Sequence, residues 1–196
     1  MAELIAGALL SSMGRVLKER IKSALTFGRT RASETNIETL DRGLLRRNDV
    51  FLSFRGEDTR DSFVSHLYAT LQNAGVIVFM DDDSLRRGDH IATSLLRAIE
   101  ESRISVIVLS KNYADSRWCL DELVKIMECR LTIGQIVLPV FYDVDPSEVR
   151  HQTGEFGKAF ESLLRGITKK KDKSFKWREA LREVAGLAGF VVPNFR

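Results

Sequence analysis

Short apolar runs alternate with stretches of helical periodicity between about residue 48 and residue 190. Four runs predict buried strands, at residues 49–54, 76–80, 104–110 and 136–142. The segments between them predict helices, at residues 58–75, 91–99 and 117–130. This alternation predicts a parallel sheet covered by helices on both faces. With right-handed crossovers, the fold is a flavodoxin-like, doubly wound α/β domain of about five strands.

The last third of the chain adds helical patterns at residues 156–164 and 175–187, joined through a lysine-rich connector at 169–173. The apolar segment 190–193 is expected to pack back on the domain. Pro139 interrupts the fourth strand pattern and predicts an edge position or a bulge there, because proline lacks a backbone N–H. We therefore divide the chain into an N-terminal extension (1–47), a domain (48–190) and a tail (191–196).

The N-terminal extension carries an amphipathic pattern followed by a polar linker. Its apolar residues 4–10 are too few to span a bilayer, and no positive charge precedes them as in a secretory signal. As a helix, it has one apolar stripe, formed by Ile5, Leu9, Met13, Val16, Leu17 and Ile21. Basic residues gather opposite, at Arg15, Lys18 and Lys22, although Arg20 intrudes on the apolar side. Three interpretations stay open: a membrane-surface helix over residues 4–25, an organellar transit peptide, or a weakly ordered extension.

Composition narrows the class of protein. In 196 residues, 44% hydrophobic and 29% charged content describe a globular protein with one domain of ordinary size. The net charge of +3 gives no case for nucleic-acid binding. Cys119 and Cys129 are ten residues apart on one predicted helix, about 15 Å, which is too far for a disulfide. Free thiols suit a reducing compartment such as the cytoplasm, and no Cys/His cluster predicts a metal site.

The segment 116–123, at the start of the third predicted helix, holds the most informative candidate chemistry. Trp118 and Glu122 are four residues apart, so a helix places them on one face. An aromatic plane beside a carboxylate can stack a flat heterocycle and stabilise a cationic centre. The alternative is a Trp that anchors the helix to the sheet beside a surface Glu.

A second candidate site follows the first strand, at residues 55–60. Gly56 allows close backbone approach to a ligand, and Arg55 and Arg60 can bind phosphate. The loop has no Walker A pattern, and a helix cap with surface arginines is an equal alternative. The acidic triplet 81–83 suggests a receiver domain, but such a domain needs carboxylates where this chain has Arg55.

Taken together, these segments closely resemble the TIR domain of plant immune receptors, over about residues 49–190. The matching blocks are 49–60 (DVFLSFRGEDTR), 79–82 (FMDD), 87–88 (RG), 96–102 (LRAIEES), 110–114 (SKNYA), 116–123 (SRWCLDEL), 138–147 (LPVFYDVDPS) and 149–154 (VRHQTG). Their common order and spacing make the resemblance specific.

The resemblance implies an enzyme of plant innate immune signalling and cell death. It would cleave the bond between nicotinamide and ribose in NAD+, or in NADP+, to give ADP-ribose or its cyclic or variant-cyclic forms. The dinucleotide is then a substrate, with no tightly bound cofactor and no metal. Glu122 matches the catalytic position. The implied substrate-binding residues are Phe54, Arg55, Gly56, Arg60, Asp81, Ser116, Trp118 and Cys119.

The resemblance also implies activation by self-association. Ser65 and His66 match one contact pair, and Trp177 and Gly186 lie on a second surface near the last helix. Other TIR-containing immune receptors are expected as further partners. No Walker A loop or leucine-rich repeats follow the domain, so the chain is either a TIR-only protein or a truncated form of a longer receptor. The rival function is a non-catalytic TIR adaptor that scaffolds its partners.

Overall fold

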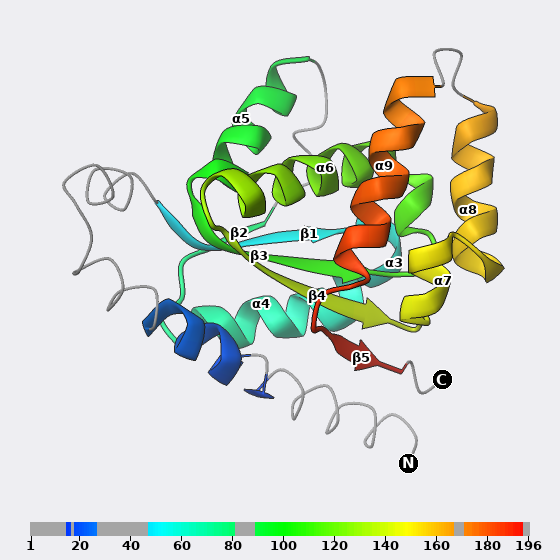
Figure 1. The fold of residues 1–196 in the computed structure, drawn as a ribbon. Coiled ribbons are helices and arrows are strands. Elements are labelled where there is room, and N and C mark those ends of the chain that lie inside the picture. Colours follow the sequence, from blue (N-terminus) through cyan, green and yellow to red (C-terminus); the bar gives the residue numbers. More distant parts are fainter. Residues whose placement is uncertain (1–14, 17, 27–46, 81–88, 167–170, 194–196) are drawn as a thin grey trace.

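A five-stranded, all-parallel sheet forms the centre of the computed structural model, which describes residues 15, 16, 18–26, 47–80, 89–166 and 171–193. The strands are β1 (Asn48–Phe54), β2 (Val78–Met80), β3 (Ser102–Leu109), β4 (Ile136–Tyr142) and β5 (Phe190–Val192). Their order in the sheet is β2-β1-β3-β4-β5 (Figure 1). The predicted doubly wound α/β fold is confirmed.

Helical segments connect the strands on both faces of the sheet (Figure 1). The first connection is continuous, with α3 (Gly56–Thr59), the π-helical turn η1 (Arg60–Val64) and α4 (Ser65–Gln72). The later ones are α5 (Asp89–Glu100), the 3-10 turn η3 (Tyr113–Asp115), α6 (Arg117–Thr132), α7 (Pro146–His151), α8 (Gly154–Arg165) and α9 (Lys171–Val184).

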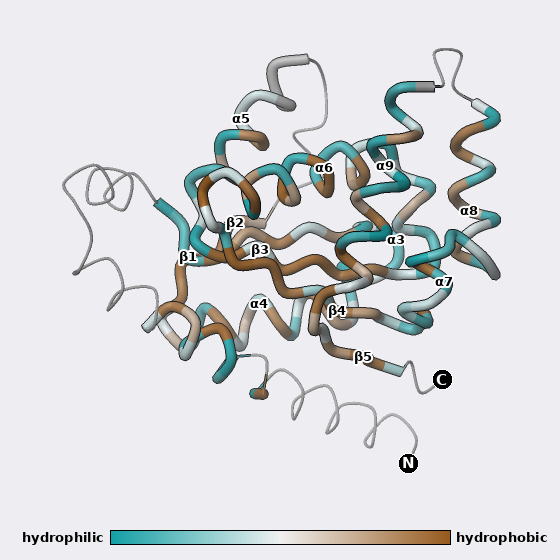
Figure 2. The backbone as a smooth tube through the Cα atoms, in the orientation of Figure 1, coloured by the Kyte–Doolittle hydropathy of each residue, from teal (hydrophilic) through white to brown (hydrophobic). Residues whose placement is uncertain are grey.

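The sheet separates two apolar cores, because successive side chains of a strand point to opposite faces. On β1, Val50, Leu52 and Phe54 pack toward α4. Phe51 packs on the other face, where α5, α6, α8 and α9 contribute the apolar side chains. Figure 2 shows the strands as the hydrophobic centre of the molecule, which explains why they read as nearly unbroken apolar runs.

Of the edge position or bulge predicted at Pro139, the structure has the edge position locally and no bulge. β4 lies between β3 and β5, and its register with β3 runs without interruption through Ile107 and Pro139. Pairing with β5 begins one residue later, at Val140. Pro139 therefore precedes the part of β4 that has a second neighbour. Gly189 permits this arrangement, since a Cβ there would lie 2.6 Å from the Pro139 carbonyl oxygen.

The apolar segment after α9 completes the sheet rather than forming a tail. Val191 and Val192 belong to β5, and Val192 is buried in the core on the α4 side. The domain boundary expected at residue 190 therefore falls inside a strand, and the sheet extends to residue 192.

Part of the N-terminal extension packs on the domain. Residues 18–26 are helical and lie beside α4 on the same face of the sheet (Figure 1). Ile21 is fully buried in the α4-side core. The Arg20 guanidinium lies 5.2 Å from the centre of the Phe190 ring, and Arg103 Nη2 donates to the Leu25 carbonyl at 3.3 Å. Ile21, from the predicted apolar stripe, thus contacts the protein's own core.

The described residues contain no helix that is both long and apolar enough to cross a membrane. Residues 1–14 and most of the linker lie outside the described part of the chain, so the transit-peptide and membrane-surface interpretations remain predictions there.

Candidate functional site

Helix α6 presents the predicted Trp–Glu pair at the carboxyl ends of the strands. Ser116 caps the helix, with its side chain accepting a hydrogen bond from Cys119 N at 3.3 Å. One turn apart, Trp118 is 38% exposed, whereas Glu122 is only 5% exposed. The alternative of a surface Glu is therefore wrong, because the face of α6 that carries Glu122 is turned toward the sheet.

Two buried hydroxyl groups lie next to Glu122. Ser53, near the end of β1, donates to Glu122 Oε2 at 2.7 Å. Ser53 Oγ is also 2.8 Å from the Tyr113 hydroxyl, which donates to the Cys119 carbonyl at 3.0 Å. β1, η3 and α6 thus meet in one hydrogen-bonded cluster around the carboxylate.

Tyr113 stays protonated in this cluster over the physiological pH range. Burial raises the pKa of Tyr113 well above its usual value of 10.0, and the neighbouring Cys119 and Glu122 raise this pKa further. The hydrogen bond with Ser53 acts in the opposite direction. A neutral phenol beside Glu122 can donate a hydrogen bond without adding a second negative charge.

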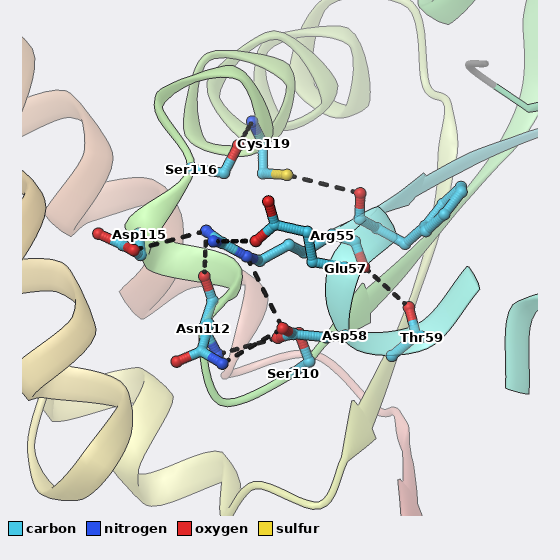
Figure 3. A network of polar contacts seen from close by, with 10 residues as sticks. Arg55, Glu57, Asp58, Thr59, Ser110, Asn112, Asp115, Ser116 and Cys119 are labelled. Carbon is cyan, nitrogen blue, oxygen red and sulfur yellow. Dashed lines mark hydrogen bonds and ion pairs between the residues drawn. The ribbon is translucent and has the colours of Figure 1, made fainter. Parts of the chain in front are cut away.

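Cys119 forms part of the wall between β1 and α6. Its side chain is 1% exposed, and Sγ lies 3.5 Å from the Phe54 carbonyl oxygen, toward which it can donate (Figure 3). The family resemblance implied that Cys119 is a substrate-binding residue. Its burial and its contact with a backbone carbonyl favour a structural role.

Arg55, predicted to bind phosphate, is surrounded by acidic partners (Figure 3). Its Nη2 lies 2.6 Å from Glu57 Oε2, and its Nη1 lies 3.7 Å from Asp115 Oδ2 and 3.2 Å from the Asn112 carbonyl. Arg55 Nε lies 3.7 Å from Asp58 Oδ1 but is buried without a hydrogen-bond acceptor. Phosphate binding would require Arg55 to exchange some of these partners.

Asp58 ties the loop after β1 to the loop after β3. Its Oδ2 accepts from Ser110 Oγ at 2.5 Å and from Asn112 N at 3.1 Å, and its Oδ1 accepts from Asn112 Nδ2 at 3.2 Å (Figure 3). Direct contacts therefore join the segments that follow the carboxyl ends of β1 and β3.

The remaining predicted substrate-binding residues lie around the same loop, with one exception. The Arg60 guanidinium is 5.1 Å from the centre of the Phe54 ring, a cation–π distance. Gly56 begins α3 directly after Arg55. Asp81 lies outside the described residues.

The predicted self-association residues differ in exposure. Ser65 and His66 are exposed on α4, where His66 Nδ1 lies 2.7 Å from the Ser62 carbonyl oxygen, and Gly186 is exposed after α9. Trp177 is 1% exposed, and its indole N–H donates to Asp121 Oδ1 at 3.0 Å. The assignment of Trp177 to a contact surface is therefore corrected: its side chain joins α9 to α6 inside the protein.

No group of three or more His, Cys, Asp or Glu side chains in the described ranges is arranged to hold a metal ion. An open depression lies between α7 and the end of α9, lined by Asp145, Pro146, Ser147, Arg150, His151 and Ala185. Its lining does not include Glu122, Trp118 or Arg55.

Sequence analysis did not identify the roles of Ser53, Tyr113 and Asp58. Ser53 had one usable signal, since it is a polar residue within the apolar run 50–54, on the same side as Phe51 and one residue before the strand ends. Tyr113 had none, because its contact with Ser53 spans 60 residues of sequence.

Comparison with known proteins matches residues 48–196 to the TIR domain family. Disease resistance protein RPV1 of Vitis rotundifolia is 60% identical over 142 residues, which are 72% of this chain and 10% of that protein. TMV resistance protein N of Nicotiana glutinosa is 55% identical over 141 residues, or 72% of this chain and 12% of that protein. The chain thus spans about a tenth of the length of these relatives.

Among solved structures, the TIR domains of the activated Roq1 resistosome are 53% identical and superpose with a TM-score of 0.67, covering 74% of this chain and 87% of that one. The five-stranded parallel sheet, with the candidate site at its carboxyl edge, agrees with the fold of these matches. The chain belongs to the TIR domain family and resembles the TIR domains of plant disease-resistance proteins.

Proposed function

We propose that this protein is an NAD+ nucleohydrolase and that Glu122 is its catalytic residue. The observation that carries the proposal is the buried Glu122 carboxylate, which accepts a hydrogen bond from Ser53 one turn from the half-exposed Trp118. Burying a carboxylate is costly unless its oxygens are hydrogen-bonded, and ionised groups in such surroundings are characteristic of functional sites.

The chemistry needs a fixed negative charge. In NAD+ the nicotinamide is bound to ribose through a cationic ring nitrogen, and it leaves as a neutral molecule with the electrons of the broken C1′–N bond. Positive charge then develops on the ribose, where the Glu122 carboxylate stabilises it. Water attacks C1′ and loses a proton, giving ADP-ribose, nicotinamide and H+; attack by another nucleophile of the same molecule gives a cyclic product.

Trp118 and the loop after β1 would bind the rest of the substrate. The exposed part of the Trp118 ring offers a surface for stacking a flat base. Arg60, whose guanidinium lies over the Phe54 ring, is a candidate for a phosphate beside Arg55, which contacts Glu57, Asp58 and Asp115. NADP+ is a second candidate substrate, since it contains the same reacting bond.

We also propose that self-association activates the enzyme. The enzyme would act in plant immunity and be located in the cytoplasm. The Roq1 TIR domains belong to an activated resistosome that recognises a pathogen effector, and several similar proteins are named for disease resistance. Ser65 and His66 are exposed and available for such contacts. Other TIR-containing receptors are candidate partners. Both cysteines are buried and neither forms a disulfide, which agrees with a reducing compartment.

The test is NAD+ depletion at a series of protein concentrations. The specific activity of the wild type is expected to rise with concentration, and Glu122→Ala is expected to remove it at every concentration. Ser65→Ala/His66→Ala should abolish the rise while leaving Glu122 in place. Gln72→Ala, another exposed position on α4, is the matched control and should behave as wild type.

The rival proposal is a non-catalytic TIR adaptor. The exposed residues of α4 favour it equally, because a scaffold also needs contact surfaces. Self-association without NAD+ depletion at any concentration, or equal depletion by wild type and Glu122→Ala, would favour the scaffold.

A further inference from the structure

The two hydroxyl groups next to Glu122 form a series of hydrogen bonds that ends at the carboxylate, called here the hydroxyl chain. Tyr113 lies 2.8 Å from Ser53 Oγ, and Ser53 Oγ lies 2.7 Å from Glu122 Oε2. Both Ser53 and Tyr113 are fully buried, so water does not compete for these contacts from the surface.

The number of available protons determines which group donates in each of these hydrogen bonds. A hydroxyl group has one proton to donate, and an ionised carboxylate can only accept. When Ser53 donates to Glu122, its oxygen is left to accept from Tyr113. The Tyr113 proton can then be shared between Ser53 Oγ and the Cys119 carbonyl, both within 3.0 Å. With Glu122 ionised, the Ser53 proton therefore points toward the carboxylate, and the Tyr113 hydroxyl is the one group of the three that can donate to Ser53 Oγ.

These hydrogen bonds also link three elements of the fold. Ser53 belongs to β1, Tyr113 to η3 and Glu122 to α6, and the Cys119 carbonyl returns the chain to the first turn of α6. A rotation of α6 that moved Glu122 would break its contact with Ser53 and the contact between Tyr113 and the Cys119 carbonyl. The position of the carboxylate is thus tied to the strand end at which the loop after β1 begins.

We propose that Ser53 and Tyr113 are positioning residues of the proposed reaction, which hold the Glu122 carboxylate in place through the chain Tyr113–Ser53–Glu122. Neither residue contacts substrate. Ser53 acts on the carboxylate directly, and Tyr113 acts through Ser53. This inference rests on the proposed NAD+ cleavage for its effect on rate, but the arrangement of the chain is independent of that reaction.

Steady-state kinetics of Ser53→Ala, Tyr113→Phe and the double variant test the proposal. Loss of one hydrogen bond to a charged group should lower kcat by about 10- to 100-fold in Ser53→Ala, with KM for NAD+ changed less than about threefold. Tyr113→Phe should lower kcat less. The double variant should nearly match Ser53→Ala alone, because the hydrogen-bonded route from Tyr113 to Glu122 runs through the Ser53 hydroxyl.

Ser105→Ala is the matched control. Ser105 is also a fully buried strand serine, and it donates to Gln135 Oε1 at 3.1 Å, away from Glu122. Its removal should change kcat by less than about twofold even if the protein loses similar stability. Ser53→Cys, which keeps the size of the side chain but donates weakly, should have a kcat between wild type and Ser53→Ala.

A carboxyl 13C NMR titration of Glu122 separates this inference from the proposed function. Loss of a donor to the ionised form should raise the apparent pKa of Glu122 in Ser53→Ala relative to wild type, whether or not NAD+ is cleaved. If the wild type does not cleave NAD+, the proposed function is rejected. The titration then tests by itself whether Ser53 and Tyr113 hold the Glu122 carboxylate. Unchanged kcat and titration in Ser53→Ala, an equal loss in Ser105→Ala, or multiplicative losses in the double variant would overturn the proposal.

Discussion

Single residues show most clearly where sequence reasoning stops. The four-residue spacing of Trp118 and Glu122 predicted a shared helix face, and α6 confirms the helix. The spacing contained no information about burial, because the side of α6 that meets the sheet depends on packing against β1 and β4. The hydroxyl partner of Glu122 was equally hidden, since Ser53 is 69 residues away along the chain.

Tyr113 offers a test of the buried cluster that does not involve substrate. Tyr113→Phe removes a hydroxyl bonded to Ser53 and Cys119, which should lower the free energy of unfolding at pH 7 by about 1–2 kcal/mol. The pKa of Tyr113 is raised in the folded protein, so its contribution is complete below its usual value of 10.0. Above that pH the unfolded chain ionises first, and the contribution declines.

Urea unfolding of wild type and Tyr113→Phe at a series of pH values measures this effect. The difference in unfolding free energy between the two proteins should narrow as the pH rises above 10.0. A difference that stays constant into the alkaline range would show that the Tyr113 hydroxyl is not buried as described.

At the scale of elements, the junction of α6 and α9 corrects the expected surface role of Trp177. Trp177, Leu181 and Val184 follow helical spacing, and all three are buried. The periodicity therefore already indicated a core position, while the family resemblance suggested a contact surface. Phe175 falls outside this stripe and is 66% exposed.

Replacing Trp177 should loosen this junction. Trp177→Phe leaves a gap and removes the donor to Asp121, which should lower the unfolding free energy by about 1–3 kcal/mol in urea titrations. Phe175→Ala on the same helix should change it by less than about 0.5 kcal/mol. Equal effects of the two substitutions would contradict the packing of α9 on α6.

At the scale of the whole molecule, the order of strands and helices was predictable because the three central strands, β1, β3 and β4, contain apolar runs buried on both faces. The packing of residues 18–26 was not, since it depends on one fully buried side chain, Ile21, and on contacts with Phe190 and Arg103 far along the chain. An amphipathic pattern predicts that an apolar face will be covered, but not by which surface.

The N-terminal helix should therefore contribute to the stability of the domain. Ile21→Ala removes buried apolar volume and should lower the unfolding free energy by about 2–4 kcal/mol, visible as a reduced Tm. Val16→Ala, at a position 54% exposed, should have an effect below about 0.5 kcal/mol. An unchanged Tm in Ile21→Ala would mean that this helix does not pack on the sheet in solution.

The most direct test of the central claim removes only the charge of Glu122. Nicotinamide release from NAD+ should be measured at high protein concentration for wild type, Glu122→Gln and Glu128→Gln, where Glu128 is an exposed acid on the same helix. We predict release by wild type and by Glu128→Gln, and loss of release in Glu122→Gln. Release by Glu122→Gln at the wild-type rate would contradict the account.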